Sequence, residues 1–414
     1  MIPPQASAPP TPYSDDTAPL IYLIAGEASG DLLGARLVAA LRARRPGLRF
    51  AGIGGAAMAA EGLTSLFPMR ELALMGLLEI LPQLRALRRR LAETTADIAA
   101  RRPAVVVTID SPGFTLRVLR AIAPLGIRRV HYVAPQVWAW RESRVRHYPG
   151  LWDRLLCLLP FEPAFFARHH LPALFVGHPV LESGADAGDA ARFRARHGLA
   201  PDARILIVMP GSRRTETTRL LPILGAALRL LAADAAGLVP VVPLAGPVAD
   251  AVRTATAAWP VKPILLDDPA EKFDAFAAAA AAVTKSGTST LELGLAGVPM
   301  VVTYRVNPLS AAIARRLVKV RFAALINLLA GREVVPELIQ QACTPALVAE
   351  ALRRLLADPE AAAAQRAGMR AALDTLRPPA GRPSDAAAAA VLELLDAATH
   401  GNVMPAQPAA PIRA

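Results

Sequence analysis

Two successive series of short apolar segments, each segment followed by a helical pattern, constrain the fold of this chain most strongly. The first series starts with LIYLIA and continues through RFAGIGG, AVVVTID, RRVHYVAP, RLLCLLP and LFVG. The second contains RILIVMPGS, LVPVVPLAG, PILLDD, AAVTKSG and PMVVTYR. Short apolar strands that alternate with helices are typical of parallel sheets with helices on both faces. We therefore predict an α/β protein with two facing Rossmann-like domains, each a doubly wound parallel sheet.

A polar, Gly- and Asp-rich stretch, LESGADAGDAARFRARHGLAPDA, separates the two series. It predicts a boundary between domains, because linkers are polar and poor in core residues. The predicted division is a Pro-rich disordered tail over 1–18, an N-terminal domain over 19–185, a linker over 186–202, a C-terminal domain over 203–375, a helix over 376–399 that could pack back on the N-terminal domain, and a disordered tail over 400–414.

The composition suits a folded chain that meets anionic partners. Of 414 residues, 53% are hydrophobic and 19% charged, and the net charge is +12. A basic surface favours nucleic acid, phosphorylated substrates or an anionic membrane, although a generally basic surface needs no specific partner. Cys157 and Cys343 lack paired spacing, which suits a reducing cytosol. We expect a soluble or peripheral protein, since no secretory signal and no run of about 20 apolar residues is present.

The strand–helix junction GEASGD lacks the G-x-G-x-x-G spacing of a dinucleotide site. Its small residues would let a ligand approach closely, and Glu27 and Asp31 add carboxylates. A plain turn, with Asp31 in the first helical turn, is the alternative. Asp110 follows the buried strand AVVVTI. A partly desolvated carboxylate there could act as a general base, or it could cap the next turn.

Two further junctions in the second half have the character of anion-binding loops. PGSR, with Gly211, Ser212 and Arg213, precedes a helix and predicts a pyrophosphate cradle, unless it is an ordinary Gly-Ser turn. KSGTSTLE offers more backbone and hydroxyl donors, and Glu292 could accept hydrogen bonds from ribose. A capping box between Ser289 and Glu292 is the alternative. Two such loops in one domain indicate a nucleoside diphosphate site.

The stretch LALMGLLEILPQLRALRRRL, residues 72–91, is apolar and then basic. It is either a buried helix with a solvated Arg face or an interfacial element that meets acyl chains and anionic headgroups. ARRLVKVR could extend the same basic surface. The scattered His residues and the lack of an Asp-x-Asp pair predict no metal site.

Nine motifs occur in an order that resembles the lipid-A-disaccharide synthases: GEASGD, ELALMGLLEIL, HYVAPQVWAWR, LPFEPAFF, GHP, PGSR, SGTSTLE, PMVVTYR and NLLAGRE. The resemblance spans residues 20–398. It implies an inverting, metal-independent glycosyltransferase of the GT-B type, in which the N-terminal domain binds acceptor and lipid and the C-terminal domain binds the UDP-sugar. The implied reaction takes 2,3-diacylglucosamine from UDP-2,3-diacylglucosamine to the 6′-hydroxyl of 2,3-diacylglucosamine 1-phosphate (lipid X), and gives the β-1,6-linked disaccharide 1-phosphate and UDP.

The resemblance also implies roles for particular residues. Asp110 would be the base, with Glu27 as its rival. The nucleotide-sugar contacts would be Gly211, Ser212, Arg213, Ser286, Gly287, Thr288, Ser289, Glu292 and Asn327, and the acceptor and lipid contacts Met75, Leu77, Leu78, Arg85, Arg88 and Arg89. We expect no cofactor, no nucleic-acid partner and a cytoplasmic protein on the anionic inner face of the inner membrane. The resemblance allows a homodimer, and the sequence does not decide the oligomeric state.

The chain departs from the family pattern beside the expected base. Many members read DAPDFN where this chain reads DSPGFT, residues 110–115, so the second carboxylate and the amide are absent. The same motifs allow alternative hypotheses about function. An isomerase acting on UDP-N-acetylglucosamine would share the fold but would need no exposed apolar helix, and a non-catalytic membrane scaffold would need neither Asp110 nor Arg213. Nucleic-acid binding is the weakest alternative, because the Arg residues lack interleaved aromatics.

Overall fold

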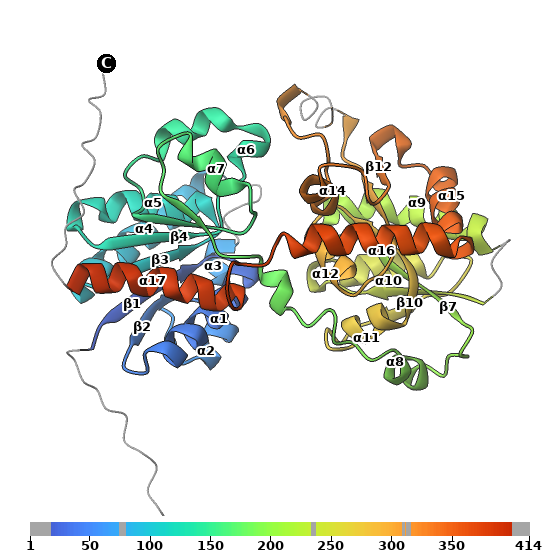
Figure 1. Cartoon of the computed structure of the whole chain (residues 1–414), viewed down its shortest axis with the longest axis horizontal. Helices are drawn as coiled ribbons and strands as arrows, with labels where there is room; N and C mark the ends of the chain where they lie inside the picture. Colours follow the sequence, from blue (N-terminus) through green and yellow to red (C-terminus); the bar gives the residue numbers. More distant parts are fainter. Residues whose placement is uncertain (1–17, 74–79, 233–236, 309–310, 312–315, 400–414) are drawn as a thin grey trace, which may run out of the picture.

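The computed structural model describes residues 18–73, 80–232, 237–308, 311 and 316–399. Two six-stranded sheets, each with helices on both sides, lie side by side (Figure 1). We call the first sheet with its helices the first lobe and the second sheet with its helices the second lobe. The described residues contain no helix that combines the length and apolar character needed to cross a membrane.

The sheet of the first lobe is parallel throughout and has the order β2-β1-β3-β4-β5-β6. Its strands are β1 (Leu20–Ala25), β2 (Arg49–Ile53), β3 (Val105–Ile109), β4 (Arg128–Tyr132), β5 (Arg154–Cys157) and β6 (Ala173–Phe175). Its helices are α1 (Ala28–Arg44), α2 (Ala56–Ala60), α3 (Arg70–Ala73), α4 (Ile80–Arg101), α5 (Pro112–Ile122), α6 (Val137–Trp140) and α7 (Glu162–Ala167), with 3-10 turns η2 (Ala123–Leu125), η3 (Glu142–His147) and η4 (Pro179–Glu182).

The sheet of the second lobe is also parallel, in the order β12-β11-β10-β7-β8-β9. Its strands are β7 (Arg204–Met209), β8 (Leu238–Pro243), β9 (Ile264–Leu266), β10 (Ala279–Lys285), β11 (Met300–Tyr304) and β12 (Glu337–Ile339). Its helices are α8 (Ala190–Arg196), α9 (Arg214–Ala232), α10 (Ala249–Thr256), α11 (Glu271–Ala278), α12 (Ser289–Leu295), α14 (Leu325–Ala330), α15 (Pro345–Ala357) and α16 (Pro359–Asp374), with 3-10 turns η5 (Gly246–Val248) and η6 (Gln340–Ala342).

These elements follow from local sequence. β1 and β3 are buried along their whole length, as near-continuous apolar strands of a doubly covered sheet should be. In α1 the residues Leu33, Leu37 and Leu41 recur every four positions and are all buried. Asp358 caps α16 by accepting hydrogen bonds from two backbone N–H groups, and Pro359 occupies the first helical position. The predicted α/β class with two doubly wound sheets is confirmed.

The last helix, α17 (Pro383–Thr399), returns from the second lobe to the first. In Figure 1 it lies on the same lobe as α1, whereas α16 lies on the other lobe. Its residues Ala387, Val391 and Leu395 belong to the same buried cluster as Leu37 of α1. The chain therefore passes between the lobes twice, before α8 and between α16 and α17.

Candidate active site

A cavity of about 380 Å³ joins the carboxyl ends of the two sheets. Its walls come from both lobes: Gly30 and Asp110 belong to the first, and Thr288, Glu292 and Leu325 to the second. Ligands of open parallel sheets bind beyond the carboxyl ends of the strands, so this position is the expected one. The cavity places a carboxylate of the first lobe opposite an anion-type loop of the second.

Asp110 directly follows β3 in a strained segment. Its φ is +49° and that of Ser111 is +46°, and two successive non-glycine residues in the left-handed region are uncommon. The hydroxyl of Thr115 donates to the Asp110 carbonyl over 2.7 Å and helps hold this turn. Burial raises the pKa of the Asp110 carboxyl, while a hydrogen bond from the Ser111 N–H opposes that rise. A carboxylate in this environment is a stronger proton acceptor than an exposed one.

The turn at Asp110 is fitted closely to the loop after β1. A Cβ on Gly26 would lie 2.5 Å from Oγ of Ser111, so only glycine fits there while Ser111 stays in place. Oγ of Ser111 is itself buried and has no hydrogen-bond partner among the described residues. Gly26 therefore lets the strained turn approach β1, and this contact fixes where Asp110 lies.

The two carboxylates of GEASGD have different surroundings. Glu27 is exposed at the N-cap position of α1 and makes no side-chain capping bond. The Asp31 carboxylate is buried and accepts hydrogen bonds from the backbone N–H groups of Gly55 at 2.7 Å, Ala57 at 2.9 Å and Met58 at 3.1 Å. Asp31 therefore holds the start of α2. Of the three carboxylates Glu27, Asp31 and Asp110, the cavity is lined by Asp110.

Glu162 and His178 also line the cavity. Glu162 is only 2% exposed, and it accepts hydrogen bonds from Trp138 Nε1 at 3.0 Å and from the N–H groups of Leu158 at 3.1 Å and Leu159 at 3.0 Å. Burial raises its pKa to about 7 despite these bonds. His178 accepts a hydrogen bond at Nδ1 from the Val180 N–H, and burial lowers its pKa to about 4. The neutral His178 ring therefore carries its proton on Nε2 and acts there as a donor.

In the second lobe, the first anion-type loop joins β7 to α9. The φ of Gly211 is +112°, and a Cβ there would lie 2.7 Å from Oε2 of Glu216, so the loop requires glycine. The Arg213 side chain is 75% exposed and lies 3.4 Å from Glu216. An exposed guanidinium beside the first turn of α9 can reach a diphosphate held at that helix start.

Lys285 connects the two loops of the second lobe. It ends β10, and its Nζ lies 3.1 Å from Oε1 of Glu216, which lies in the first turn of α9, directly after the other loop. A Cβ on Gly287 would be 3.6 Å from the same Nζ, so the ammonium also lies beside the second loop. Glu216 is 8% exposed at its side chain, so it fixes Lys285 between the loops. Lys285 and Arg213 thus place two positive charges beside the two anion-type loops.

The second loop leads into α12 without the capping box that its sequence allowed. Thr288 is the N-cap, and Ser289 is already helical and bonds to Oγ1 of Thr284 at 3.0 Å. Glu292 instead receives two hydrogen bonds from Lys272 of α11, at 2.8 and 2.9 Å. Lys272 therefore holds the Glu292 carboxylate at the cavity wall. The hydroxyl of Ser286 donates to the Ala323 carbonyl at 2.7 Å, which ties the loop to the segment before α14.

Comparison with known proteins decides the family. A family model described as lipid-A-disaccharide synthetase matches residues 21–391. The lipid-A-disaccharide synthase of Granulibacter bethesdensis is 60% identical over 92% of this chain and 99% of its own, and that of Gluconobacter oxydans is 57% identical over 91% of each. The chain belongs to the lipid-A-disaccharide synthase family. It is accordingly a glycosyltransferase, and the resemblance of its motifs to this family is confirmed.

Solved structures that are similar to this chain show the same two-lobed α/β fold. They include UDP-GlcNAc 2-epimerase from Neisseria meningitidis bound to UDP-GlcNAc, with a TM-score of 0.61 and 13% identity over 91% of this chain and 99% of that one. The calicheamicin glycosyltransferase CalG4 has a TM-score of 0.58 and 18% identity over 94% and 100%. Both support the GT-B arrangement of two facing parallel sheets. The epimerase likeness concerns fold alone, so it does not favour the isomerase reading.

One predicted nucleotide contact, Asn327, has a structural role within the second lobe. Asn327 of α14 is fully buried, and its amide nitrogen donates to the Val335 carbonyl and to Glu337, both at 2.8 Å. Its amide oxygen accepts from the N–H groups of Val334 at 2.7 Å and Val335 at 2.9 Å. All four hydrogen-bonding positions of the amide are occupied. Asn327 therefore holds the segment before β12, and its contact with a nucleotide stays a prediction.

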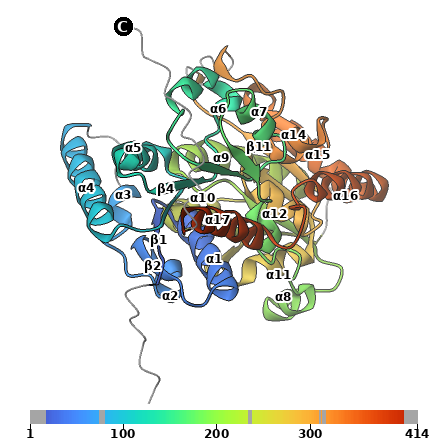
Figure 2. The ribbon, with the colours of Figure 1, turned by 60° about the vertical axis from the view of Figure 1, so that its left-hand side comes forward.

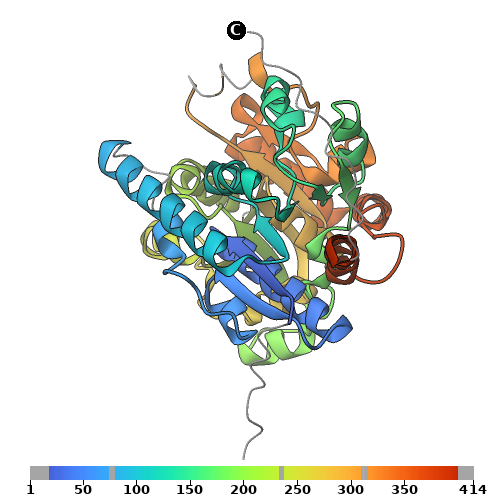
Figure 3. The ribbon, with the colours of Figure 1, turned by 90° about the vertical axis from the view of Figure 1, so that its left-hand side faces the viewer.

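The structure describes only part of the predicted lipid-contact stretch. Met75, Leu77 and Leu78 lie outside the described residues. Figures 2 and 3 show α4, which follows them, as a long helix at the outer side of the first lobe. Arg85, Arg88 and Arg89 are exposed on it.

Arg90, which follows Arg89 on α4, has a different environment. It pairs with Glu71 and Glu93, each at 2.5 Å, and lies 4.4 Å from the centre of the Phe67 ring. Arg90 therefore fastens α4 to the lobe, and the exposed basic face of α4 consists of Arg85, Arg88 and Arg89.

Proposed function

We propose that this chain transfers 2,3-diacylglucosamine from UDP-2,3-diacylglucosamine to the 6′-hydroxyl of 2,3-diacylglucosamine 1-phosphate, with inversion. The products are the β-1,6-linked disaccharide 1-phosphate and UDP. The observation that carries the proposal is the shared cavity, in which Asp110 of the first lobe faces Thr288 and Glu292 of the second. Family membership supports the chemistry, and a cavity lined by both lobes supports our assignment of the acceptor to the first lobe and of the UDP-sugar to the second.

In the proposed mechanism Asp110 accepts the proton of the 6′-hydroxyl while that oxygen attacks the anomeric carbon of the donor. The new C–O bond forms as the bond to UDP breaks on the opposite face, so the configuration inverts. The electron pair of the breaking bond goes to the β-phosphate oxygen. Arg213, Lys285 and the free N–H groups at the start of α9 would stabilise that charge. Glu27, which is exposed and does not line the cavity, has weaker support as the base.

The proposal requires no metal, because cations of the chain are available for the leaving diphosphate. Glu292, which Lys272 holds, would accept hydrogen bonds from the ribose hydroxyls of the UDP, and Ser212 with the Ser286–Ser289 loop would supply further donors. We expect transfer to continue in excess EDTA. Loss of activity in EDTA that Mg²⁺ restores would contradict this part of the proposal.

We also propose that the protein works in the cytoplasm on the inner face of the inner membrane. The apolar stretch before α4 and the exposed arginines of α4 would bind the membrane surface. A homodimer is compatible with this arrangement. The test is flotation with vesicles that contain phosphatidylglycerol, compared with neutral vesicles. Equal flotation with both vesicle types would contradict the electrostatic part of the proposal.

The decisive experiment measures UDP release from UDP-2,3-diacylglucosamine in detergent micelles, with and without the acceptor. Wild type should release UDP only when the acceptor is present. Asp110→Asn should lower kcat by about 10²–10⁴-fold while donor binding is retained, because the variant loses only a proton acceptor. Glu27→Gln is the matched control and should keep most activity. Collapse in Glu27→Gln with little change in Asp110→Asn would reverse the assignment of the base.

A further inference from the structure

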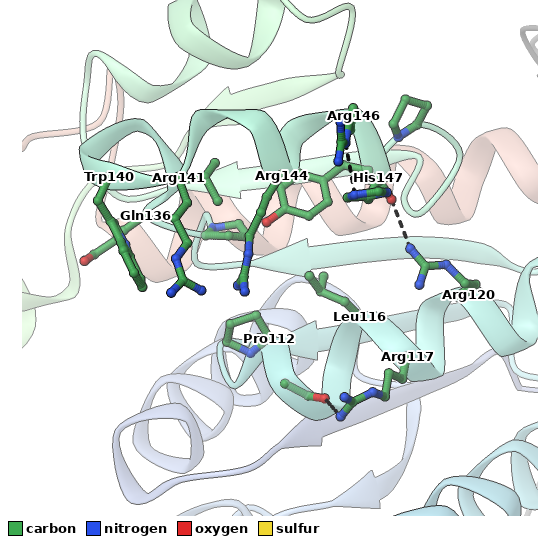
Figure 4. A pocket seen from close by; sticks show the side chains of 15 residues that line it. Pro112, Leu116, Arg117, Arg120, Gln136, Trp140, Arg141, Arg144, Arg146 and His147 are labelled. Carbon is green, nitrogen blue, oxygen red and sulfur yellow. Dashed lines mark hydrogen bonds between the residues drawn. The ribbon is translucent and has the colours of Figure 1, made fainter. Parts of the chain in front are cut away.

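A second cavity, of about 1070 Å³, lies beside the Asp110 turn in the first lobe. Figure 4 shows it between α5 below and the segment of α6 and η3 above. Its lining is exceptionally basic and includes Arg117 and Arg120 from α5, and Arg141, Arg144, Arg146 and His147 from the opposite segment. We call this set the arginine pocket. No aspartate or glutamate lines it.

The arginines of the pocket have no carboxylate partners among the described residues. Arg117 donates to the Gly113 carbonyl, Arg120 donates to the His147 carbonyl at 3.0 Å, and the guanidinium of Arg141 lies 4.0 Å from the centre of the Trp140 ring. The neighbouring acid, Glu142, forms a salt bridge of 2.7 Å with Lys319 of the second lobe.

Several positive charges around one cavity repel each other when no acid lies between them. An anionic ligand would relieve this repulsion and would be attracted by the summed field of the cavity.

The shape of the pocket indicates which anion it would bind. In Figure 4 Arg141 and Arg144 both point from the upper segment into the cavity, toward the side on which Pro112 lies. Planar guanidinium groups bind phosphate oxygens in pairs, which suits a phosphate monoester. Trp140 is 41% exposed and lines the same cavity with Leu116, so the pocket also offers apolar surface. A phosphate on an amphiphilic molecule fits both properties.

The position of the pocket connects it to the reaction. Pro112 and Gly113, which line it, come directly after the Asp110–Ser111 turn, and Gln136 lines both cavities. Two cavities that share a lining residue suit one ligand with a hydroxyl at Asp110 and a phosphate among the arginines. The helix that forms the floor of the pocket, α5, also packs against α4, which carries the exposed basic face described above.

We propose that Arg141 and Arg144 of the arginine pocket bind the phosphate monoester of the acceptor while its 6′-hydroxyl meets Asp110. This inference rests on the proposed function, and in it the two arginines select the acceptor through its phosphate. The phosphate orients the sugar, so an acceptor without it should bind weakly and react slowly. Anionic headgroups of a bilayer have the same chemistry, and the experiment below separates them from the acceptor.

The test compares the phosphorylated acceptor with 2,3-diacylglucosamine that lacks the phosphate, in non-ionic detergent micelles. Arg141→Gln/Arg144→Gln should raise KM for the phosphorylated acceptor by about tenfold or more, since charge-assisted hydrogen bonds are lost. KM for the other acceptor and for the donor should not change. Arg229→Gln/Arg370→Gln removes two exposed charges from the second lobe and is the matched control, which should leave both KM values as in wild type.

Equal losses on both acceptors would overturn the proposal, because the arginines would then not sense the phosphate. The proposal also fails if the pocket variant has unchanged KM in micelles but no longer floats with phosphatidylglycerol vesicles, since the pocket would then serve the bilayer. A wild type that transfers to neither acceptor would instead refute the proposed function. If circular dichroism shows that the double variant is unfolded, inhibition of transfer by glucosamine 1-phosphate tests the proposal instead. That probe should compete with the acceptor in wild type and lose about tenfold in potency in Arg144→Lys, and equal potency would overturn the proposal.

Discussion

Glu162 allows a prediction whose size follows from its surroundings. Its carboxyl group is 2% exposed and accepts three hydrogen bonds, from Trp138 and from two backbone N–H groups. Burial nevertheless raises its pKa from the ordinary value of 4.5 to about 7. The folded chain therefore keeps a proton on Glu162 over a pH range in which the unfolded chain has released it. Glu162→Gln removes this titration and keeps the shape of the side chain.

The sign and magnitude follow from proton linkage. Because the folded pKa is the higher one, this group contributes most to stability below about pH 4.5, and the contribution is lost as the pH rises through about 7. Each pH unit in that window is worth about 1.4 kcal/mol, so wild type should lose about 3 kcal/mol relative to Glu162→Gln across it. The variant itself should be less stable at low pH by about 1 kcal/mol, since its amide NH₂ would face the Trp138 N–H.

Urea denaturation at several pH values between 4.5 and 8 measures this difference. Of the four Trp residues three belong to the first lobe, so a Trp259→Phe background lets fluorescence follow that lobe. His178 and Asp110 also titrate, but they are present in both proteins and cancel in the difference. If the free energies of unfolding of wild type and Glu162→Gln run parallel over the whole range, the argument from burial is refuted.

Three further changes test other parts of the site. Asp31→Ala should destabilise the protein by about 2–3 kcal/mol in urea denaturation, because three backbone N–H groups at the start of α2 lose their acceptor; an unchanged midpoint would contradict this role. Gly26→Ala should lower kcat about 10²-fold by displacing the Asp110 turn, and much less in a Ser111→Gly background, where the clashing hydroxyl is absent; equal losses in both backgrounds would exclude the steric explanation. Lys272→Met should raise KM for the UDP-sugar about threefold with little change in kcat, since Glu292 loses the partner that positions it; an unchanged KM would show that Glu292 needs no such support.

The apolar alternation of the sequence was sufficient to predict the two sheets, because buried parallel strands need near-continuous apolar residues. It did not predict β12, whose three residues are each only partly buried and follow Pro336. It also left open where α17 packs. Its Ala-rich sequence suits any helical partner, and the face of α1 that receives it lies more than 300 residues earlier in the chain.

The candidate site was predictable where a charged residue follows an apolar strand within a short loop, as at Asp110 and Arg213. Sequence alone could not separate Asp110 from Glu27, because only the fold shows which of them lines the cavity. Lys285 lies inside the quoted KSGTSTLE motif, but its role depends on Glu216 in the first turn of α9, about 70 residues earlier in the chain. The arginine pocket was missed for a similar reason, since its arginines come from two segments that meet only in the folded lobe.

The return of α17 has a consequence for how the protein is made. The core of the first lobe contains side chains from both ends of the polypeptide, including Leu37 and Val391. While the ribosome is still synthesising the second lobe, the apolar face of α1 has no helix to cover it. The second lobe, whose strands and helices all lie between these two segments, does not depend on the final helix in this way. We therefore expect the first lobe to mature after the second, and nascent chains to need protection from aggregation until α17 has been made.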